Sequence, residues 1–492
     1  MKHAGVRDRT EHPRDAFSWR KFGRHYIHAF VWIIVLTVLV HFMEVSGVLK
    51  GFEMAGLDTL LRLHGRQMST RVVLVEITDE DYKDPKLFAG KSPLSNEQLL
   101  KLVSSIQNYH PAAIGMDFDT SSEDWCAVDA SSLAHVLPPP TSGPAILPPV
   151  VWAEIPSNVE EQLKLSPVLG GMLQNHDFVG VPRFPVDSDG LVRRYESEFR
   201  VTGSLEGCPK QSSVLPAHAP EIPAVLDTNS DNAGNDRDSM VSFARAVLHR
   251  ACGDAQINCS SLRPDLRHPV IFNFYGDRYR FPIIQSHEFV GPSADALADD
   301  KSIHRHRQDL LKDKIVLIGG NFTAARDVYM TPLGEMAGVE LIALAIESDF
   351  DGGIHETQKW LEKCADILVG SLIVLVYFYY RRRPRFAMML SLVGVPMVAI
   401  AFSLLLFRTA AYWFNFMPII IGMVLHQMLE LSESCGELQE EVQELERQLH
   451  ARSESVSIVE PPRTEPTSLT DQAVPTEEKK LPEGKKPPAV SD

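Results

Sequence analysis

The chain has 492 residues, and 48 Lys and Arg stand against 64 Asp and Glu, so its formal net charge is -16. This acidic balance argues against nucleic acid as a partner, because affinity for phosphates comes from clustered Lys and Arg. At 44% hydrophobic residues the chain is too polar for a multi-span transporter, and it fits a water-soluble domain carried by a few membrane spans.

Four apolar stretches interrupt the polar chain. They cover residues 29–48, 365–380, 386–407 and 410–429. A helix needs roughly 20 mostly apolar residues to cross the core of a bilayer, so we predict four transmembrane helices at these bounds. The polar residues 50–360 then form one large domain between the first and second spans, which is not the layout of a pore.

Basic residues predict how the chain is oriented in the membrane. Residues 1–28 form a basic leader, and the loop after the second stretch holds arginines at 381–383 and 385, whereas the loop after the third holds only Arg408. The positive-inside rule therefore predicts both termini in the cytoplasm and the 50–360 domain outside it. A cleaved signal peptide is the alternative for residues 29–48, but the long apolar run and the weak cleavage signal favour an uncleaved anchor.

Strands alternate with helices in the external domain. Short apolar runs predict strands at 71–77, 112–118, 145–153 and 314–318, and apolar spacing predicts helices at 95–107, 239–250 and 337–350. Asp-Gly at 189–190 and Gly-Asp at 276–277 predict hairpin turns. We therefore predict an α/β fold with a mixed sheet and helices on both faces. Residues 202–238, rich in Pro, Ser, Asn and Asp, are predicted to be a surface insertion.

Polar side chains follow three of these strands. Asp79 and Asp81 follow the first, Asp117 and Asp119 follow the second, and Asn321 follows the strand at 314–318. Parallel strands would bring these loops to one carboxyl edge, where open α/β sheets bind ligands. Acids at that edge could hold a cation or accept hydrogen bonds from a small ligand. The alternative is that they only fasten turns and helix caps.

The cysteines and histidines give little indication of a metal site or a catalytic site. Cys252 and Cys259 are seven residues apart in the external domain, where thiols tend to pair, so they are a candidate disulfide; free thiols are the alternative. His304 and His306 alternate with arginines, which is typical of a solvated face rather than a metal site. The sequence holds no recognisable nucleotide-binding, hydrolase, metalloprotease or kinase motif. We predict no catalytic residue, no metal and no cofactor.

A series of short blocks resembles a known family. The blocks are Gly56-Leu57-Asp58, then residues 73–80, 111–118, 187–194 and 311–319, then Asp327 with Thr331-Pro332, and residues 338–340. Their order and the pattern of spans resemble the second class of CHASE domain (cyclase/histidine-kinase-associated sensory extracellular), here CHASE-two, over roughly residues 50–429. The resemblance implies a bacterial membrane protein with an external α/β sensor domain. Asp327 completes the set of candidate ligand residues.

The C-terminal region departs from the usual family pattern. Residues 430–492 are too few for the cyclase or kinase domain that usually follows, and they begin with an apolar heptad instead. Val at an a position of the heptad, together with Leu at the d positions, favours a parallel two-stranded coiled coil. We therefore predict a coiled coil at 428–450 and a homodimer. A lone amphipathic helix is the alternative. Residues 453–492, rich in Pro, Glu and Lys, are predicted to be disordered.

Two functions of different class fit these features. The first is a non-catalytic extracytoplasmic sensor, anchored in the bacterial inner membrane, that transmits an unknown signal to a separate and unknown cytoplasmic partner. The second is a membrane-tethered external hydrolase, which needs a nucleophile and a base that the sequence does not offer. A scaffold that senses nothing is a third reading. The sensor is the favoured hypothesis.

Overall fold

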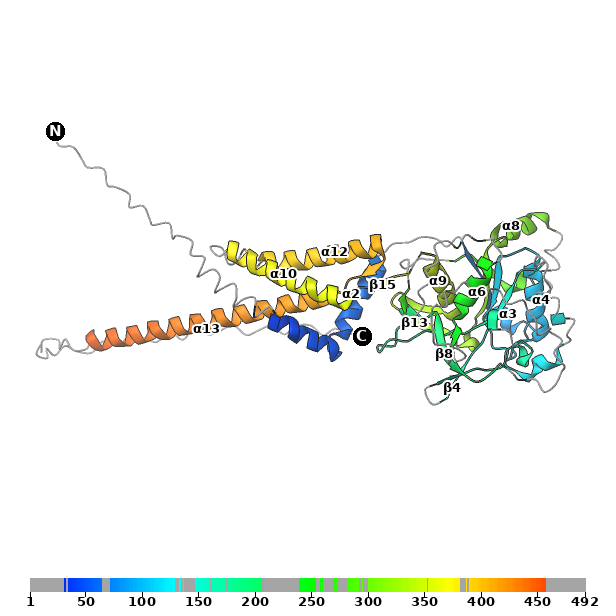
Figure 1. Cartoon of the computed structure of the whole chain (residues 1–492), viewed down its shortest axis with the longest axis horizontal. Helices are drawn as coiled ribbons and strands as arrows, with labels where there is room; N and C mark the ends of the chain where they lie inside the picture. The colour runs from blue at the N-terminus through cyan, green and yellow to red at the C-terminus, as the bar shows by residue number, and fades with distance from the viewer. Residues whose placement is uncertain are drawn as a thin grey trace, which may run out of the picture. The chain divides into compact units, whose positions relative to one another are not determined.

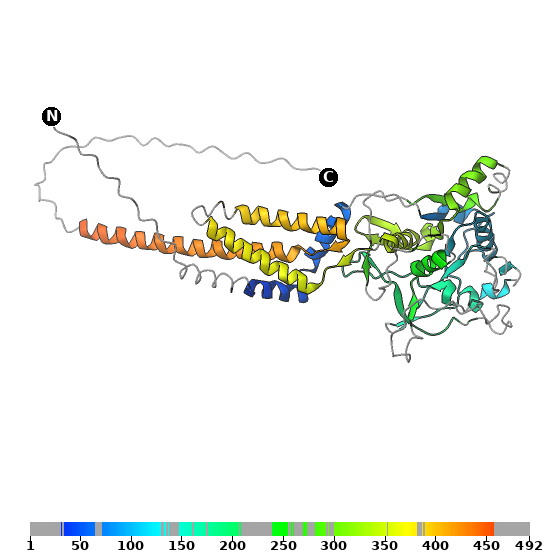
Figure 2. The ribbon, with the colours of Figure 1, turned by 45° about the horizontal axis from the view of Figure 1, so that its top comes forward.

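The structure is a computed structural model (Figures 1 and 2) and describes residues 31, 34–63, 71–128, 132–133, 136, 147–159, 162–173, 176–205, 207, 239–253, 257, 259, 269–272, 281–291, 294, 300–351, 353–380, 386 and 389–456. It divides into two compact units, residues 1–427 and 428–492. The first unit holds the α/β domain and the apolar helices, and the second holds most of one long helix. Each unit is described by itself.

A parallel sheet of six strands forms the centre of the α/β domain. Its order is β11-β1-β12-β2-β3-β6, and every neighbouring pair is parallel. The central strands β1 and β12 are apolar and almost wholly buried, as expected for a sheet covered on both faces. The strands are β11 (Ile283–Gln285), β1 (Val72–Thr78), β12 (Ile315–Asn321), β2 (Ala113–Met116), β3 (Val150–Ala153) and β6 (Val179–Gly180). The predicted mixed sheet is therefore a parallel one in the part of the chain that is described.

Helices cover both faces of this sheet, as predicted. On one face Val73 and Val75 pack in a core with α4 (Asn96–Gln107). On the other face Val72 and Leu74 pack in a core with α6 (Phe243–Gly253) and α9 (Gly338–Asp351). Figure 1 shows α6 and α9 together on one side and α4 on the other. Because successive side chains of a strand point to opposite faces, the four strands β1, β12, β2 and β3 contribute to both cores.

Smaller elements surround the sheet. The antiparallel pairings lie here, in a four-stranded sheet of order β4-β5-β8-β9 and in the pairs β10-β7 and β13-β14. The strands are β4 (Ser157–Val159), β5 (Gln162–Lys164), β7 (Arg194–Tyr195), β8 (Glu198–Thr202), β9 (Ser239–Val241), β10 (Val270–Ile271), β13 (Val328–Thr331) and β14 (Gly334–Ala337). The remaining helices of the domain are α2 (Lys50–Leu63), α3 (Asp79–Lys83) and α8 (Lys301–Leu311), with short 3-10 turns between elements.

One local prediction differs from the structure. The turn at Asp187–Gly190 is present, with Gly190 N donating to Asp187 O at 2.9 Å, but the strands on either side do not pair as a hairpin: β6 joins the main sheet and β7 pairs with β10. The second predicted hairpin turn, at 276–277, and most of the predicted insertion lie outside the described residues.

The apolar helices are fewer than the four predicted spans. Among the described residues one helix, Leu390–Ala410, is long and apolar enough to cross a membrane. It comprises a π-helical turn, η8 (Leu390–Gly394), and α12 (Val395–Ala410). A second span is counted if Ile34–Val45 and α2, which meet at 86°, are taken as one bent span.

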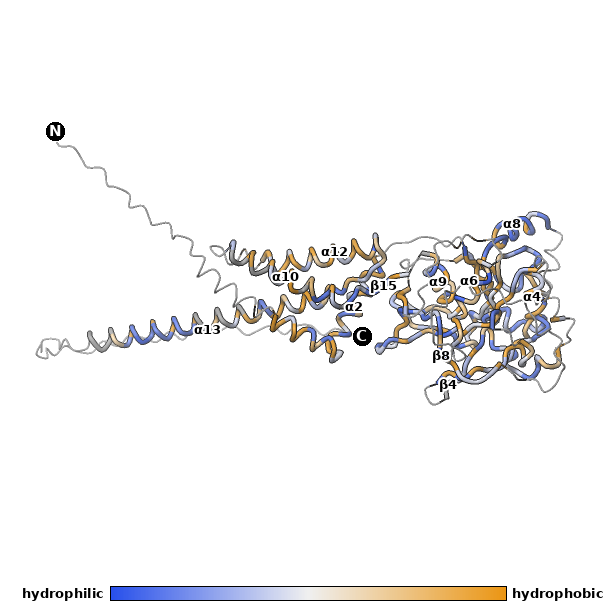
Figure 3. The backbone as a smooth tube through the Cα atoms, viewed as in Figure 1, coloured by the Kyte–Doolittle hydropathy of each residue, from blue (hydrophilic) through white to orange (hydrophobic). Residues whose placement is uncertain are grey.

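The other two predicted spans are altered by polar residues and by a strand. Helix α10 (Lys359–Tyr379) starts before the predicted stretch, and its first turns hold Glu362 and Lys363. In the fourth stretch Tyr412–Trp413 form β16, so α13 (Met417–Val456) begins later and its apolar part ends at Leu429. Figure 3 shows the apolar colouring of α10 and α12 and the more polar later turns of α13.

A two-stranded connection ties the apolar helices together at one end. Strand β15 (His355–Glu356), which leads into α10, pairs in parallel with β16, which leads into α13. Thr357 N also donates to Trp413 O at 3.1 Å. The carboxylate of Glu362 accepts hydrogen bonds from the Thr357 hydroxyl and from Asn415 N. The starts of α10 and α13 are therefore held against each other.

The second unit begins at Met428, the first residue of the predicted coiled coil. Helix α13 continues through it to Val456. Its apolar heptad side chains are exposed in this chain, with Leu438 63% and Leu449 66% exposed. The coiled coil itself stays a prediction.

Candidate functional site

The predicted loops lie at one edge of the sheet. Strands β1 and β12 are in register to their ends, where Thr78 is opposite Asn321. On the other side of β12, Asp117 N donates to Ile318 O at 2.9 Å, just past the end of β2. Because these strands are parallel, the segments that follow them share the carboxyl edge, the usual ligand-binding edge of open α/β sheets.

Asp79 connects two of these segments. Its carboxylate accepts hydrogen bonds from Thr323 Oγ1 at 2.8 Å and from Thr323 N at 3.3 Å, in the turn that follows β12. The Thr323 hydroxyl is the main cause of a lowered pKa of Asp79, and Lys83 contributes to it. Asp79 is exposed and fastens one loop to the next.

Asp81 is buried and organises a neighbouring strand end. Its Oδ2 accepts a hydrogen bond from Ser286 Oγ at 2.7 Å, and its Oδ1 lies 2.8 Å from His287 Nδ1. Ser286 and His287 follow β11, which pairs with β1, so they belong to the same edge. His287 is 35% exposed while Asp81 is 3% exposed. Sequence reasoning missed both residues, although they stand directly after an apolar strand.

A second group of acids lies on the face of the sheet that α9 covers. Burial, and then repulsion from Asp327, raises the pKa of Asp117 well above its usual range. Burial also raises the pKa of Asp327, and the Tyr329 hydroxyl beside it partly offsets this. Two carboxyl groups that repel each other in a partly buried place favour a shared proton or a cationic partner.

The start of α9 brings Asp327 to this place. Gly338 N donates to Asp327 O at 2.9 Å. A Cβ on Gly338 would lie 2.0 Å from Asp327 Oδ2, so no other residue fits without displacing the carboxylate. Only the absence of a side chain at Gly338 allows this acid to approach the helix, and this contact could not be predicted from spacing.

Glu76 adds a buried acid from inside β1. Asn321 Nδ2 donates to Glu76 Oε2 at 2.9 Å. Glu76 is 4% exposed, and its Oε1 has no hydrogen-bond partner among the described residues. Burial raises the pKa of nearby Glu340; the Ala337 N–H lowers it, and the charge of Glu76 raises it further. We call Glu76, Asp117, Asp327 and Glu340 the edge acids.

Asp119 belongs to a different part of the edge. It is exposed, and its Oδ1 accepts a hydrogen bond from Ser121 N at 2.9 Å, which is turn chemistry. Its charge acts on Glu154, the residue that follows β3. Burial raises the pKa of Glu154 to about 7, a hydrogen bond from Ser166 N opposes this, and the charge of Asp119 adds to it.

A small hollow lies between the segment after β6 and α9. It is lined by Arg183, Phe184 and Tyr195 and by Ile342 of α9, and none of the edge acids borders it. Phe184 packs against Tyr329 at 5.6 Å between ring centroids. Its free volume is about 10 Å³, roughly the room that one water needs, so it is too small for a ligand molecule.

The edge acids are acceptors rather than a chelating group. Within the described ranges no three His, Cys, Asp or Glu side chains are close enough to hold a metal ion. His304 and His306 are exposed on α8. The arrangement suits a ligand that donates hydrogen bonds or carries positive charge across a wider span than a metal ion.

The tandem arginines of the 187–194 block form a cluster of ion pairs with acidic residues. Arg193, 1% exposed, donates five hydrogen bonds to Asp58, Asp187 and Asp189, all between 2.7 and 2.9 Å. Burial opposes the charge of Arg193, but these carboxylates raise its pKa above the ordinary value. Asp58 belongs to α2, so the cluster fixes that helix to the domain. The spacing of these residues in the sequence does not indicate this role, because Asp58 lies 135 residues before Arg193.

Arg194 makes a second attachment. Its Nη2 lies 2.6 Å from Glu356 Oε1, in β15, directly before α10. Arg62 of α2 also donates to Pro332 O at 3.1 Å. We call Arg193, Arg194, Asp58 and Glu356 the stalk clamp, because it connects the domain to α2 on one side and to the start of α10 on the other.

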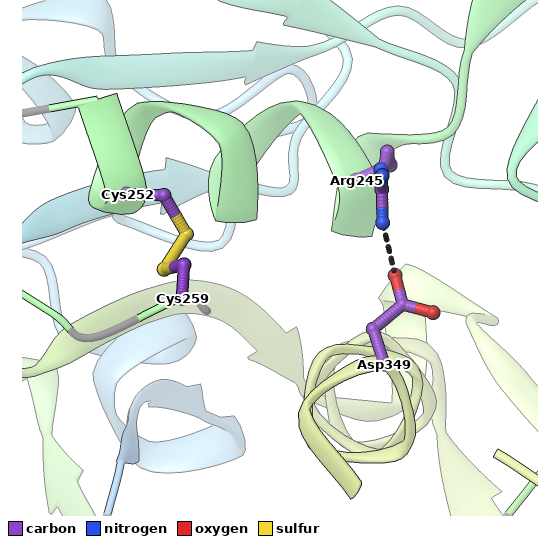
Figure 4. The surroundings of a disulfide bond; sticks show 4 residues. All are labelled: Arg245, Cys252, Cys259 and Asp349. Carbon is purple, nitrogen blue, oxygen red and sulfur yellow. Dashed lines mark ion pairs between the residues drawn. A yellow bond between two sulfur atoms is a disulfide. The ribbon is translucent and has the colours of Figure 1, made fainter. Parts of the chain in front are cut away.

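Cysteines strengthen the domain near α6. Cys252 and Cys259 form a disulfide (Figure 4), the pairing that their spacing suggested. Cys126 is also disulfide-bonded, whereas Cys364 and Cys435 are free. In the same view Arg245 of α6 and Asp349 of α9 form an ion pair at 3.5 Å, which links the two helices that cover one face of the sheet.

Comparison with known proteins gives one match. A family model described as CHASE2 domain matches residues 31–377, which is most of the chain. The match starts in the first apolar helix and ends inside α10, so it includes the stalk clamp as well as the sheet. Searches of curated proteins and of solved structures find no match.

Replacing Glu154 with Gln is expected to stabilise the protein at pH 8 and to change little at pH 4. The pKa of Glu154 is about 7 in the folded chain against an ordinary value of 4.5. The stability linked to its protonation is therefore complete below pH 4.5 and is lost as the pH rises through 7. Gln carries no charge and escapes this loss.

The measurement is the Tm of wild type and variant, compared at each pH. Glu335→Gln, an exposed carboxylate of β14, is the matched control and should leave Tm unchanged at all pH values. An equal Tm difference between wild type and Glu154→Gln at pH 4 and pH 8 would contradict the linkage.

Proposed function

The chain belongs to the CHASE2 domain family, whose domains are extracellular sensors, and from this we propose that it is a membrane-anchored sensor that signals to a separate cytoplasmic partner. The observation that carries the proposal is the stalk clamp. One block of the domain, residues 187–194, holds both the helix that precedes the sheet and the strand that leads out to α10. A change in the position of this block would reach both connections at once.

The proposed signal is a small molecule bound at the carboxyl edge. The support is the unpartnered oxygen of Glu76 and the raised pKa values of Asp117, Asp327 and Glu340. A ligand that donates hydrogen bonds there would remove a cost of leaving buried acids unsatisfied. Asp79, Asp81 and Asn321 would support the site through their contacts with neighbouring loops, and Asp119 would contribute least.

The proposed route to the cytoplasm runs through β15 and β16. Arg194 contacts Glu356 of β15, β15 pairs with β16, and β16 leads into α13. Helix α13 is continuous from Met417 to Val456. A displacement at Glu356 would therefore be passed to α13 without crossing a flexible segment of the described chain.

We further propose that the apolar helices cross a bacterial cytoplasmic membrane, with both termini inside. The exposed apolar side chains of α10 and α12, among them Leu372 at 52% and Val398 at 69%, support contact with lipid. Disulfides in the α/β domain, at Cys252–Cys259 and at Cys126, fit an oxidising compartment outside the cytoplasm. The heptad side chains of α13 are proposed to pair with those of a second copy.

The hydrolase alternative is less well supported. A serine hydrolase needs its nucleophile to donate a hydrogen bond to the base. Ser286 instead donates to Asp81, and His287 contacts the other oxygen of the same carboxylate. The three side chains are therefore arranged to orient the histidine rather than to activate the serine.

Reporter fusions test the topology. A fusion inserted at Ser230 is expected to report the extracytoplasmic side, and one at Glu465 is expected to report the cytoplasm. The reason is that the positive-inside rule places the basic loop at 381–385 in the cytoplasm, and the C-terminal segment is expected on the same side. A reporter that is active only outside the cytoplasm and one that is active only inside should be used at each site. The same compartment at both sites would contradict the topology and the sensor with it.

Glu356→Gln tests the stalk clamp. The pair with Arg194 is partly exposed, at 25% and 47%, so its loss should cost less than about 1 kcal/mol of stability. The rate of oxidative crosslinking between copies through the free thiol of Cys435 should nevertheless change, because Arg194 no longer forms an ion pair with β15, the strand that pairs with β16 just before α13. Glu335→Gln serves again as the control. An unchanged crosslinking rate in Glu356→Gln would remove the support for this route.

Charged residues at Leu438 and Leu445 test the dimer. A charge in the seam of a coiled coil is poorly solvated, so Leu438→Glu together with Leu445→Glu should abolish crosslinking through Cys435 in membranes. Glu441→Gln, outside the apolar heptad, is the matched control and should crosslink like wild type. Crosslinking that survives the double replacement would favour the lone helix.

A further inference from the structure

A cavity lies among the helices of the first unit, far along the chain from the edge acids. It is bordered by the first apolar helix, Ile34–Val45, by α10 and by the first turns of α13. Leu36, Val40, Ile419 and Met423 form buried walls. Its free volume is about 60 Å³, several times the roughly 10–15 Å³ that one water needs, so it has room for a small group of a larger molecule.

Two glycines create part of this space. Gly370 of α10 and Gly422 of α13 both border the cavity. Glycine in membrane helices usually lets two backbones come close together. At Gly422, however, an added Cβ would meet nothing nearer than Val40 Cγ2 at 3.8 Å, an ordinary contact distance. The missing side chain therefore leaves volume instead of bringing two helices together.

Polar groups are few on the lining. Thr37 of the first apolar helix and His426 of α13 border the cavity. An ionisable side chain among membrane helices is costly and commonly marks a ligand or ion site. A hydroxyl and an imidazole both form hydrogen bonds with oxygen. Apolar walls with a few polar groups are the usual make-up of a small-molecule site.

We propose that this cavity binds a neutral, membrane-dissolved lipophile that carries at least one carbonyl or hydroxyl oxygen. The walls would surround its hydrocarbon part, and Thr37 and His426 would bond its oxygen. A charged ligand is disfavoured because it would lose its hydration among apolar side chains. The occupant would contact α13 directly, so it would act as a second input to the helix that leads to the cytoplasm. The proposal rests on the proposed membrane placement of these helices.

Photolabelling of the full-length protein in phosphatidylcholine nanodiscs tests this. The probe is a long-chain alkyl ketone with a diazirine, and a matched alkane diazirine is the second probe. The ketone should label peptides from residues 34–45 and 417–427. Gly422→Leu should reduce this labelling by about tenfold or more, since the added side chain occupies the ligand volume. Gly436→Leu, where an added Cβ meets nothing within 4 Å, should label like wild type.

The other outcomes are distinct. Unchanged ketone labelling in Gly422→Leu overturns the proposal, and equal labelling by the alkane shows that lipid acyl chains fill the cavity, which also overturns it. Gly422→Ala is the control for misfolding in the larger variant, because its added Cβ fits at 3.8 Å from Val40 Cγ2. This variant should be labelled less than wild type. Labelling of Leu372 and Val398 by the alkane reports membrane placement separately, and its absence would instead contradict the proposed topology.

Discussion

The five hydrogen bonds of Arg193 are the interaction on which the arrangement of the α/β domain depends. An arginine has five N–H donors, and here each one meets a carboxylate oxygen of Asp58, Asp187 or Asp189. A buried charge with only some partners would destabilise the fold, and removing one partner of such a group commonly costs about 3–5 kcal/mol. The turn, the arginine and α2 therefore stay in place together. Lysine, a point charge with three donors, could not replace this fork.

The parallel sheet explains why acids collect at one edge. Each parallel strand ends with free polar groups at the same side, and the segments that follow must use short polar side chains to satisfy them. Asp79 and Asp81 do this with Thr323, Ser286 and His287. Glu76 is satisfied only in part, because one of its carboxylate oxygens has no hydrogen-bond partner among the described residues. The edge thus contains both structural acids and acids that remain available to a ligand.

The sequence predicted elements that depend on local pattern. β1, β12, α4 and α9 follow from apolar runs and helical spacing, and the shared edge of the predicted loops follows from the parallel strands. Contacts between distant residues were not predictable: Gly338 beside Asp327 and Arg193 beside Asp58 depend on how the chain returns to itself. The Asp-Gly turn was found at its position, but its strands pair elsewhere because a turn signal does not specify partners. The predicted spans differ from the helices since β16 forms inside an apolar stretch.

The bend between Ile34–Val45 and α2 has a mechanical consequence. The two helices meet at 86°, so a push along the axis of the first helix acts sideways on α2. Helix α2 has 14 residues and is therefore about 21 Å long. Asp58, part-way along α2, is held by Arg193. A thrust along the first helix would therefore load this contact across the axis of α2 rather than along it.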